Sequence, residues 1–272
     1  MNPLAWLALL GLGTLDITTS ELEAAAALEI SDRLESPRAR VQVRVVLNGL
    51  EGALGHLDSA TITASGFSVK ELPFYTEPWR SKYGRVGTLR IVLTDFSLAG
   101  LHVQELSASV PDCRYDRGLA LDDRAFRISR SGTGWGSVTI NELDLADFIL
   151  KRSPNIERAT VRVFSDVVWI EGTGTILISK TDFTVVGRLS TRDGFQIDIE
   201  PRKVFFGWQR ADQSLLDAVA RALNPVIDIS RDLGLGDALT IYEISLRDGV
   251  LRASGPARIP IKTGGPPTDN KG

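Results

Sequence analysis

The two histidines and the single cysteine are the residues best suited to metal or nucleophilic chemistry. His56 and His102 are far apart in the sequence, and neither belongs to a His-x-x-x-His or His-Glu pattern that would place two metal ligands on one helix. Cys113 has no second cysteine to pair with, and no nucleophile signature surrounds it. We therefore expect no metal, no cofactor and no internal disulfide, and we expect Cys113 to be a small buried apolar residue.

Paired carboxylates are a second candidate for chemistry. Asp122 and Asp123 are adjacent, and Asp144 and Asp147 are close in sequence, so either pair could supply a general acid and a general base. Adjacent acids on loops and at helix starts are usually solvated, or they interact favourably with the helix N-terminus. We therefore favour a structural role for both pairs and predict that the protein is not an enzyme.

Arginines gather in one stretch of the chain and could bind phosphate groups through bidentate hydrogen bonds. The stretch also holds Tyr115 and Phe126, and its arginines are Arg114, Arg117, Arg124, Arg127 and Arg130. Acidic residues in and beside the stretch offset much of this charge, namely Asp112, Asp116, Asp122 and Asp123. A solvated surface of mixed charge is the favoured interpretation, and contact with anionic headgroups or a membrane surface is the alternative.

Two glycine-rich segments have the composition of phosphate-binding loops. They are residues 131–137, Ser-Gly-Thr-Gly-Trp-Gly-Ser, and residues 172–175, Gly-Thr-Gly-Thr. A phosphate-binding loop follows a strand and opens directly into a helix, and neither segment meets both conditions. We predict a hairpin turn at 172–175, and a turn at 131–137 that leads into a short strand at 138–140.

The overall composition is that of a globular protein with balanced charge. The chain has 272 residues, of which 43% are hydrophobic, so it can bury one large core or two smaller ones. Its 31 Lys and Arg residues against 34 Asp and Glu residues give a formal net charge of -3. Because the whole protein carries no basic field and no basic aromatic stripe occurs, we expect no nucleic-acid partner.

Alternating apolar and polar residues predict long strands over most of the chain. Residues 41–45, Val-Gln-Val-Arg-Val, alternate as a half-buried strand does. Further strands are predicted near residues 57–65, 86–98, 102–110, 159–171, 175–189, 195–199, 239–246 and 250–254. Several exceed the usual strand length of about five or six residues, which indicates long, twisted strands in a mainly antiparallel sheet.

Three amphipathic helices accompany the predicted strands. The first covers residues 20–35, with Ser20 as its N-cap and Glu23 as the partner in a capping box. The second covers residues 141–152 and the third residues 212–223, and each is followed by an X-Pro pair that ends it. We expect both short helices to lay their apolar sides on the concave face of the sheet.

The two ends of the chain are expected to lie outside the folded domain. Residues 1–19 contain an apolar run that resembles part of a secretory signal, but no Lys or Arg precedes it and no clear cleavage site follows. A weak or uncleaved export signal is favoured over a start codon placed too far downstream and over a buried N-terminal segment. We assign one domain to residues 20–261 and a disordered tail to residues 262–272.

Several segments together resemble the LmeA-like family of bacterial phospholipid-binding proteins. They are the alanine-rich helix, the long alternating strands, and the segments INELDLADFI at 140–149, IDIEPRKV at 197–204 and ALNPVID at 222–228. The resemblance covers nearly the whole chain from Ser20 to Pro260. It implies a single α+β domain similar to a half-unit of the tubular lipid-binding proteins, in which a long, curled, mainly antiparallel sheet wraps around amphipathic helices.

The resemblance also implies a function. It implies that the protein binds a phospholipid or similar amphiphile in an apolar groove without catalysis, and that it could transfer this lipid at the bacterial cell envelope. Long strands and amphipathic helices can supply the continuous apolar lining that a lipid requires. The predicted lining residues are Leu145, Phe148, Ile149, Leu215, Leu216, Val219 and Leu223. The alternative is a structural or interaction protein in which these residues fill a core and no ligand binds.

An aromatic loop is the predicted contact with a membrane surface or a lipid headgroup. Aromatic residues beside basic ones suit the bilayer interface, and the predicted contact residues are Phe74, Tyr75, Trp79, Arg80 and Lys82. The aromatic residues could equally fold under the loop and close one end of the core. We expect a periplasmic or other extracytoplasmic location, with the cytoplasm as the alternative, and the sequence identifies no protein partner.

Overall fold

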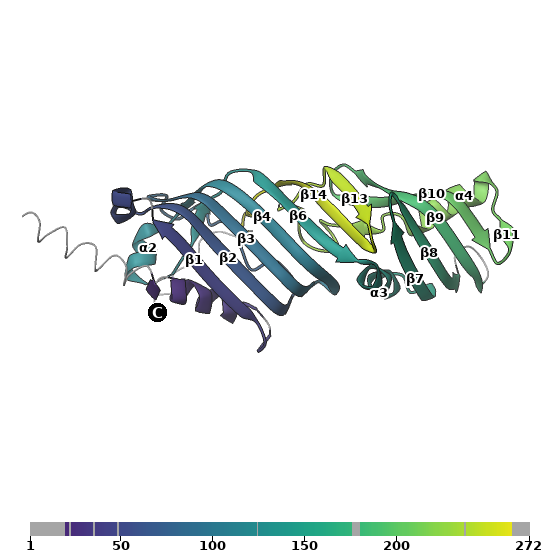
Figure 1. Ribbon diagram of the computed structural model, residues 1–272, viewed down its shortest axis with the longest axis horizontal. Helices are drawn as coiled ribbons and strands as arrows, with labels where there is room; N and C mark the ends of the chain where they lie inside the picture. Colours follow the sequence, from purple (N-terminus) through teal and green to yellow (C-terminus); the bar gives the residue numbers. More distant parts are fainter. Residues whose placement is uncertain are drawn as a thin grey trace, which may run out of the picture.

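The computed structural model describes residues 20–262, except for residues 22, 35, 48, 124, 176–179 and 237. Within these residues the chain forms two mostly antiparallel sheets with short helices beside them (Figure 1). The predicted α+β class is therefore confirmed. The predicted export segment and the predicted tail beyond Lys262 lie outside the described residues. Among the described helices, none has the length and apolar character that a membrane span requires.

The larger sheet contains the longest strands, in the order β1-β2-β3-β4-β6-β14-β13, with β5 paired to β4. Its strands β2 and β3 pair in parallel, whereas the other described pairs are antiparallel. The strands are β1 (Arg40–Leu47), β2 (His56–Val69), β3 (Gly84–Leu98), β4 (Leu101–Tyr115), β5 (Ile128–Arg130), β6 (Gly134–Asn141), β13 (Glu243–Arg247) and β14 (Val250–Ala257). Alternation along β3 buries Leu89, Ile91 and Leu93 on one face, and each fully buried side chain of this size stabilises the fold by about 1.5–3 kcal/mol.

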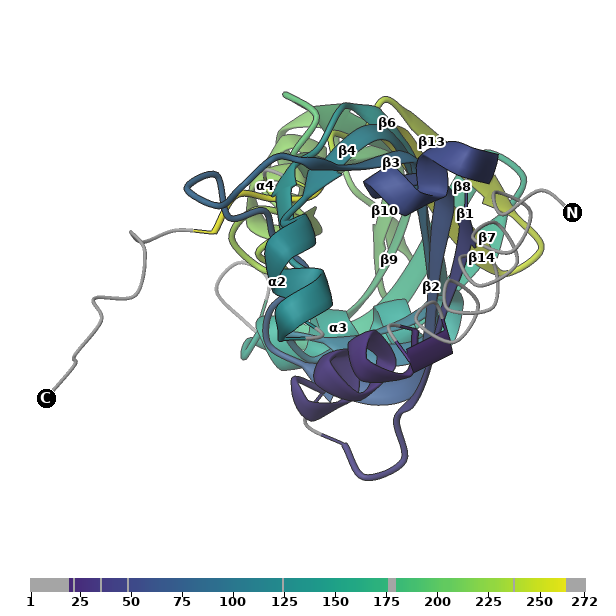
Figure 2. The ribbon, with the colours of Figure 1, turned by 90° about the vertical axis from the view of Figure 1, so that its left-hand side faces the viewer.

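The smaller sheet has the order β11-β10-β9-β8-β7, with β12 paired to β10. All its described pairs are antiparallel. The strands are β7 (Ile156–Phe164), β8 (Val167–Thr175), β9 (Lys180–Arg192), β10 (Gln196–Phe206), β11 (Gln209–Arg210) and β12 (Ile227–Asp228). In Figure 1 this sheet continues the larger one along the long axis of the molecule, and Figure 2 shows the elements arranged around that axis.

The helices begin where local capping signals predict. Helix α3 (Glu142–Arg152) starts after Asn141, whose side chain accepts the N–H of Asp144, and α4 (Gln213–Leu223) starts after Asp212 in the same way. The N-terminal helix comprises residues 20–21 and 23–32, and the carboxylate of Glu23 accepts the N–H of Val45 on β1 at 2.6 Å. The remaining helical segments are η1 (Gly49–Leu54) and α2 (Arg117–Asp122).

One strand prediction and one turn prediction are wrong in the smaller sheet. The stretch 159–171 is two strands, because Asp166 reverses the chain between β7 and β8 with a φ of 65°. The segment 172–175, predicted as a turn, lies inside β8. A side chain at Gly172 would place its Cβ 2.4 Å from the carbonyl oxygen of Arg158, so glycine permits close pairing with β7 there.

Several strand boundaries also differ from prediction. Strand β6 begins at Gly134, so it includes much of the glycine-rich segment 131–137 that was predicted as a turn. At Gly134 a Cβ would lie 1.8 Å from the carbonyl oxygen of Ser109 on β4, which explains the need for glycine in this strand. Strand β10 extends to Phe206 instead of ending at 199, and β13 begins at Glu243 instead of 239.

Candidate functional site

An apolar pocket lies over the concave face of the larger sheet and is called the inner pocket below. Strands β3 and β4 form its floor with Ile91, Leu93, Leu106 and Ala108, and segments distant in sequence form the opposite wall with Leu72, Phe74, Leu235 and Leu239. It encloses about 480 Å³, its open mouth included. The hydroxyls of Ser107 and Ser137 are hydrogen-bonded to each other at 3.1 Å on the other face of the sheet, because Ser107 alternates along β4 with Leu106 and Ala108. The floor therefore presents an almost wholly apolar surface.

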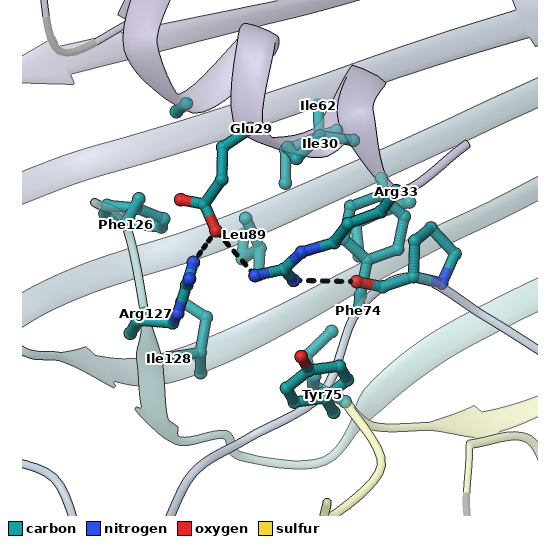
Figure 3. A pocket seen from close by; sticks show the side chains of 14 residues that line it. Glu29, Ile30, Arg33, Ile62, Phe74, Tyr75, Leu89, Phe126, Arg127 and Ile128 are labelled. Atoms are coloured by element: carbon teal, nitrogen blue, oxygen red, sulfur yellow. Dashed lines mark hydrogen bonds and ion pairs between the residues drawn. The ribbon is translucent and has the colours of Figure 1, made fainter. Parts of the chain in front are cut away.

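A second pocket, the outer pocket, lies between the N-terminal helix and the same sheet. It spans about 510 Å³, its open mouth included. Figure 3 shows its apolar side chains from the helix, β2, β3, β5 and the segment before β5, which include Ile30, Ile62, Leu89, Phe126 and Ile128. Phe74, Ile91 and Ile259 line both pockets. The two pockets therefore adjoin and offer one continued apolar surface along the sheet.

A polar rim borders the outer pocket. Glu29 and Arg33 lie one turn apart on the N-terminal helix, with Arg33 Nη2 2.5 Å from Glu29 Oε1, and Arg127 contacts the same oxygen (Figure 3). Arg33 Nη1 also donates to the carbonyl of Pro73 at 3.2 Å. Burial lowers the pKa of the Arg127 guanidinium because a charged group is poorly solvated there. The rim therefore combines positive charge with partial exclusion of water.

The predicted membrane-contact loop is folded against this rim. Phe74 lines both pockets, and Tyr75 lines the outer pocket, where Lys262 Nζ lies 4.6 Å from the centre of its ring. Arg80 contacts the buried carboxylate of Glu77. Trp79 is half-buried, and of the predicted contact residues only Lys82 is highly exposed. The loop thus closes one side of the apolar surface.

The predicted groove-lining residues do not line either apolar pocket. On α3, Leu145, Phe148 and Ile149 are buried, and on α4, Val219 is fully buried in the core. Leu215, Leu216 and Leu223 are half-buried and pack against the same core. Phe148 and Leu223 border two further pockets near Arg152, and the one beside Leu223 is largely polar. The structure therefore separates these seven residues from the apolar surface over the larger sheet.

Sequence reasoning missed the residues that do line that surface. Leu93, Leu106 and Ala108 follow the alternation of two unusually long strands, and this length is the one signal that could have indicated them. Alternation alone identifies a buried face, but it does not tell whether side chains or empty space lie opposite.

Of the candidate catalytic groups, the structure brings His102 and Asp144 together. The described residues contain no cluster of three or more His, Cys, Asp or Glu side chains that could hold a metal ion. Cys113 is fully buried, as predicted. His102 lies between Asp144, 2.8 Å from its Nδ1, and Asp95, 3.0 Å from its Nε2. The hydrogen bond to Asp144 contributes most to raising the pKa of His102, which suits an electrostatic link between β4 and α3.

A fully exposed tryptophan stands at the end of the smaller sheet. Trp208 follows Gly207 in the tight turn between β10 and β11, and Figure 1 places this hairpin at the opposite end of the molecule from the N-terminal helix. Phe205 and Phe206 precede the turn and Arg210 follows it. The hairpin tip is therefore aromatic and basic, a combination suited to a membrane interface.

Comparison with known proteins identifies a family for this chain. Searches of curated proteins and of solved structures gave no match. The family model described as LmeA-like phospholipid-binding matches residues 83–255, which is more than half of the chain. This match begins just before β3 and ends within β14, so it includes the strands that form the floor of the inner pocket. The chain therefore belongs to the LmeA-like phospholipid-binding family.

Proposed function

We propose that the protein holds a phospholipid or similar amphiphile, with its acyl chains in the adjoining inner and outer pockets. The observation that carries this proposal is the almost wholly apolar surface that Ile91, Leu93, Leu106 and Ala108 present to the inner pocket. Phe74, Ile91 and Ile259 line both pockets, so a single acyl chain could follow the sheet from one pocket into the other. A lipid would cover apolar surface that the chain itself leaves open.

The energetic demand of lipid binding fits such a surface. A phospholipid has roughly 30 methylenes, and shielding each from water is worth about 0.8 kcal/mol. Directional polar groups cannot supply this energy, whereas a continued apolar lining can. The ionisable side chains at the outer pocket are engaged with one another, which supports binding without catalysis.

We further propose that the lipid is transferred at the cell envelope and that the protein touches a membrane through the Trp208 hairpin. An exposed indole beside Arg210 would insert at the headgroup level, where aromatic and basic side chains are favourable. The apolar run within residues 1–19 supports an extracytoplasmic location.

Native mass spectrometry of the gently purified chain, with extraction of what co-purifies, tests the lipid proposal. A stoichiometric phospholipid is the expected result. The variant Ala108→Phe should lose the lipid, because the new ring fills the inner pocket from its floor. Ser109→Phe is the matched control, since neighbouring residues of a strand point to opposite faces. A parent protein without lipid, even after incubation with bacterial lipids, would favour the filled-core structural protein.

A further inference from the structure

Two guanidinium groups at the rim of the outer pocket share one carboxylate. Arg33 Nη2 lies 2.5 Å from Glu29 Oε1, and Arg127 Nη1 contacts the same oxygen (Figure 3). The two arginines come from different parts of the chain, one from the N-terminal helix and the other from the segment before β5. Glu29 therefore joins the helix to the opposite wall of the pocket.

Positive charge exceeds negative charge around this contact. Arg127 Nε lies 3.6 Å from Glu77, whose carboxylate Arg80 also contacts, so three guanidinium groups of the rim face two carboxylates. The Lys262 amino group adds a further positive charge 3.4 Å from the hydroxyl of Tyr75. An anion with oxygens at the position of the Glu29 carboxylate would thus meet a favourable field.

We propose that Arg33 and Arg127 bind the phosphate group of an anionic phospholipid headgroup, for which the carboxylate of Glu29 is an internal competitor. A phosphodiester, like a carboxylate, offers two charged oxygens to a guanidinium fork. The three side chains are only 22% to 27% exposed, so water screens their charges less than on an open surface. The inference rests on the proposed function, because the acyl chains of the same lipid would lie in the adjoining pockets.

The test offers the full chain two lipids with identical acyl chains, phosphatidylglycerol and diacylglycerol, mixed in equal amounts. The bound lipids are extracted and measured by mass spectrometry, and the parent protein should be enriched in phosphatidylglycerol. The double variant Arg33→Gln and Arg127→Gln should lower the ratio of phosphatidylglycerol to diacylglycerol about tenfold or more, because charge-assisted hydrogen bonds are lost. The control Arg44→Gln, on an exposed position of β1, should leave the ratio unchanged.

The variant Glu29→Gln tests the same proposal in the opposite direction. It keeps the size of the side chain and removes the competing charge, so the ratio should rise above that of the parent. The proposal is overturned if the parent takes up both lipids equally, or if neither the arginine variants nor Glu29→Gln change the ratio. The phosphate bound at this rim could belong to a lipid headgroup or be free inorganic phosphate, and calorimetry with inorganic phosphate separates these two sources. If the protein binds inorganic phosphate but does not discriminate between the two lipids, the headgroup assignment is overturned. A parent that takes up neither lipid would refute the proposed function itself.

Discussion

Asn224 completes two hydrogen bonds with the backbone of Ile199. Its Oδ1 accepts the N–H of Ile199 at 2.7 Å, and its Nδ2 donates to the carbonyl of the same residue at 2.8 Å. The side chain thereby imitates a neighbouring strand at a point where β10 would otherwise have two unpaired polar groups. Because Asn224 directly follows α4, this pair fixes the end of that helix to the smaller sheet.

The variant Asn224→Ala should lower the free energy of unfolding by about 1–3 kcal/mol, since it leaves the two polar groups of Ile199 without partners. Urea unfolding followed by circular dichroism measures this change. The exposed Asn155→Ala is the control and should stay within about 0.5 kcal/mol of the parent. Equal stability of the two variants would show that water replaces the side chain of Asn224.

The positions of α3 and α4 were predictable from sequence because capping and helical periodicity act over a few residues, as Asn141 and Asp212 show. The short helix α2 was not predicted. The turn at Asp166 was not, because it adopts a positive φ without a glycine to mark it. The requirement for glycine at position 172 was also not predictable, because it depends on the close approach of the Arg158 carbonyl on the neighbouring strand. Contacts between strands are a long-range property that no local pattern contains.

The position of the apolar pockets could not be predicted either, because it also depends on contacts between segments distant in the sequence. Val219 and Leu106 both belong to apolar stripes, yet the first meets core atoms on every side and the second borders an open pocket. What distinguishes them is the opposite wall, which Leu72 and Leu235 provide from distant segments. Phe74 likewise lines both pockets, and the sequence of its aromatic loop is compatible with a loop that folds inward or outward.

The stability of the protein should depend on pH through His102. Its hydrogen bonds to Asp144 and Asp95 raise its pKa above the ordinary value of 6.5. Because the pKa of His102 is higher in the folded state, its protonation stabilises the fold. This stabilisation is fully present below about pH 6.5 and is lost as the pH rises through the folded-state pKa. Because His102 is 42% exposed, the effect is modest. The variant His102→Gln should therefore be less stable than the parent near about pH 5.5 and similar to it near about pH 8.5. Urea unfolding measures the difference in free energy of unfolding between the variant and the parent. An equal difference at both pH values would contradict a pH-dependent contribution of His102.

The thiol of Cys113 should be unreactive in the folded protein. Loss of solvation on burial raises its pKa to about 11, so at about pH 8 only about one thousandth of the thiol is ionised. Labelling with a chromogenic disulfide should be slow in buffer and complete in denaturant. The double variant Cys113→Ala and Ser68→Cys provides the control, because Ser68 is exposed on β2 and its replacement should react at the rate of a free thiol. Fast labelling of native Cys113 would show that its strand opens readily.

Membrane contact should depend on Trp208 more than on the other exposed aromatic residues. Burying one large side chain at the interface is worth about 1.5–3 kcal/mol, so Trp208→Ala should weaken binding to phosphatidylglycerol vesicles about tenfold or more. The control is Trp135→Ala on β6, where the indole is half exposed and packs edge-on against Tyr242. Vesicle co-sedimentation measures the binding, and lipid extraction checks that both variants still carry ligand. Equal vesicle binding by both variants would place the contact elsewhere. Retained ligand together with lost vesicle binding in Trp208→Ala would separate membrane contact from lipid binding, because the β10–β11 hairpin lies at the other end of the molecule from the N-terminal helix, which lines the outer pocket (Figure 1).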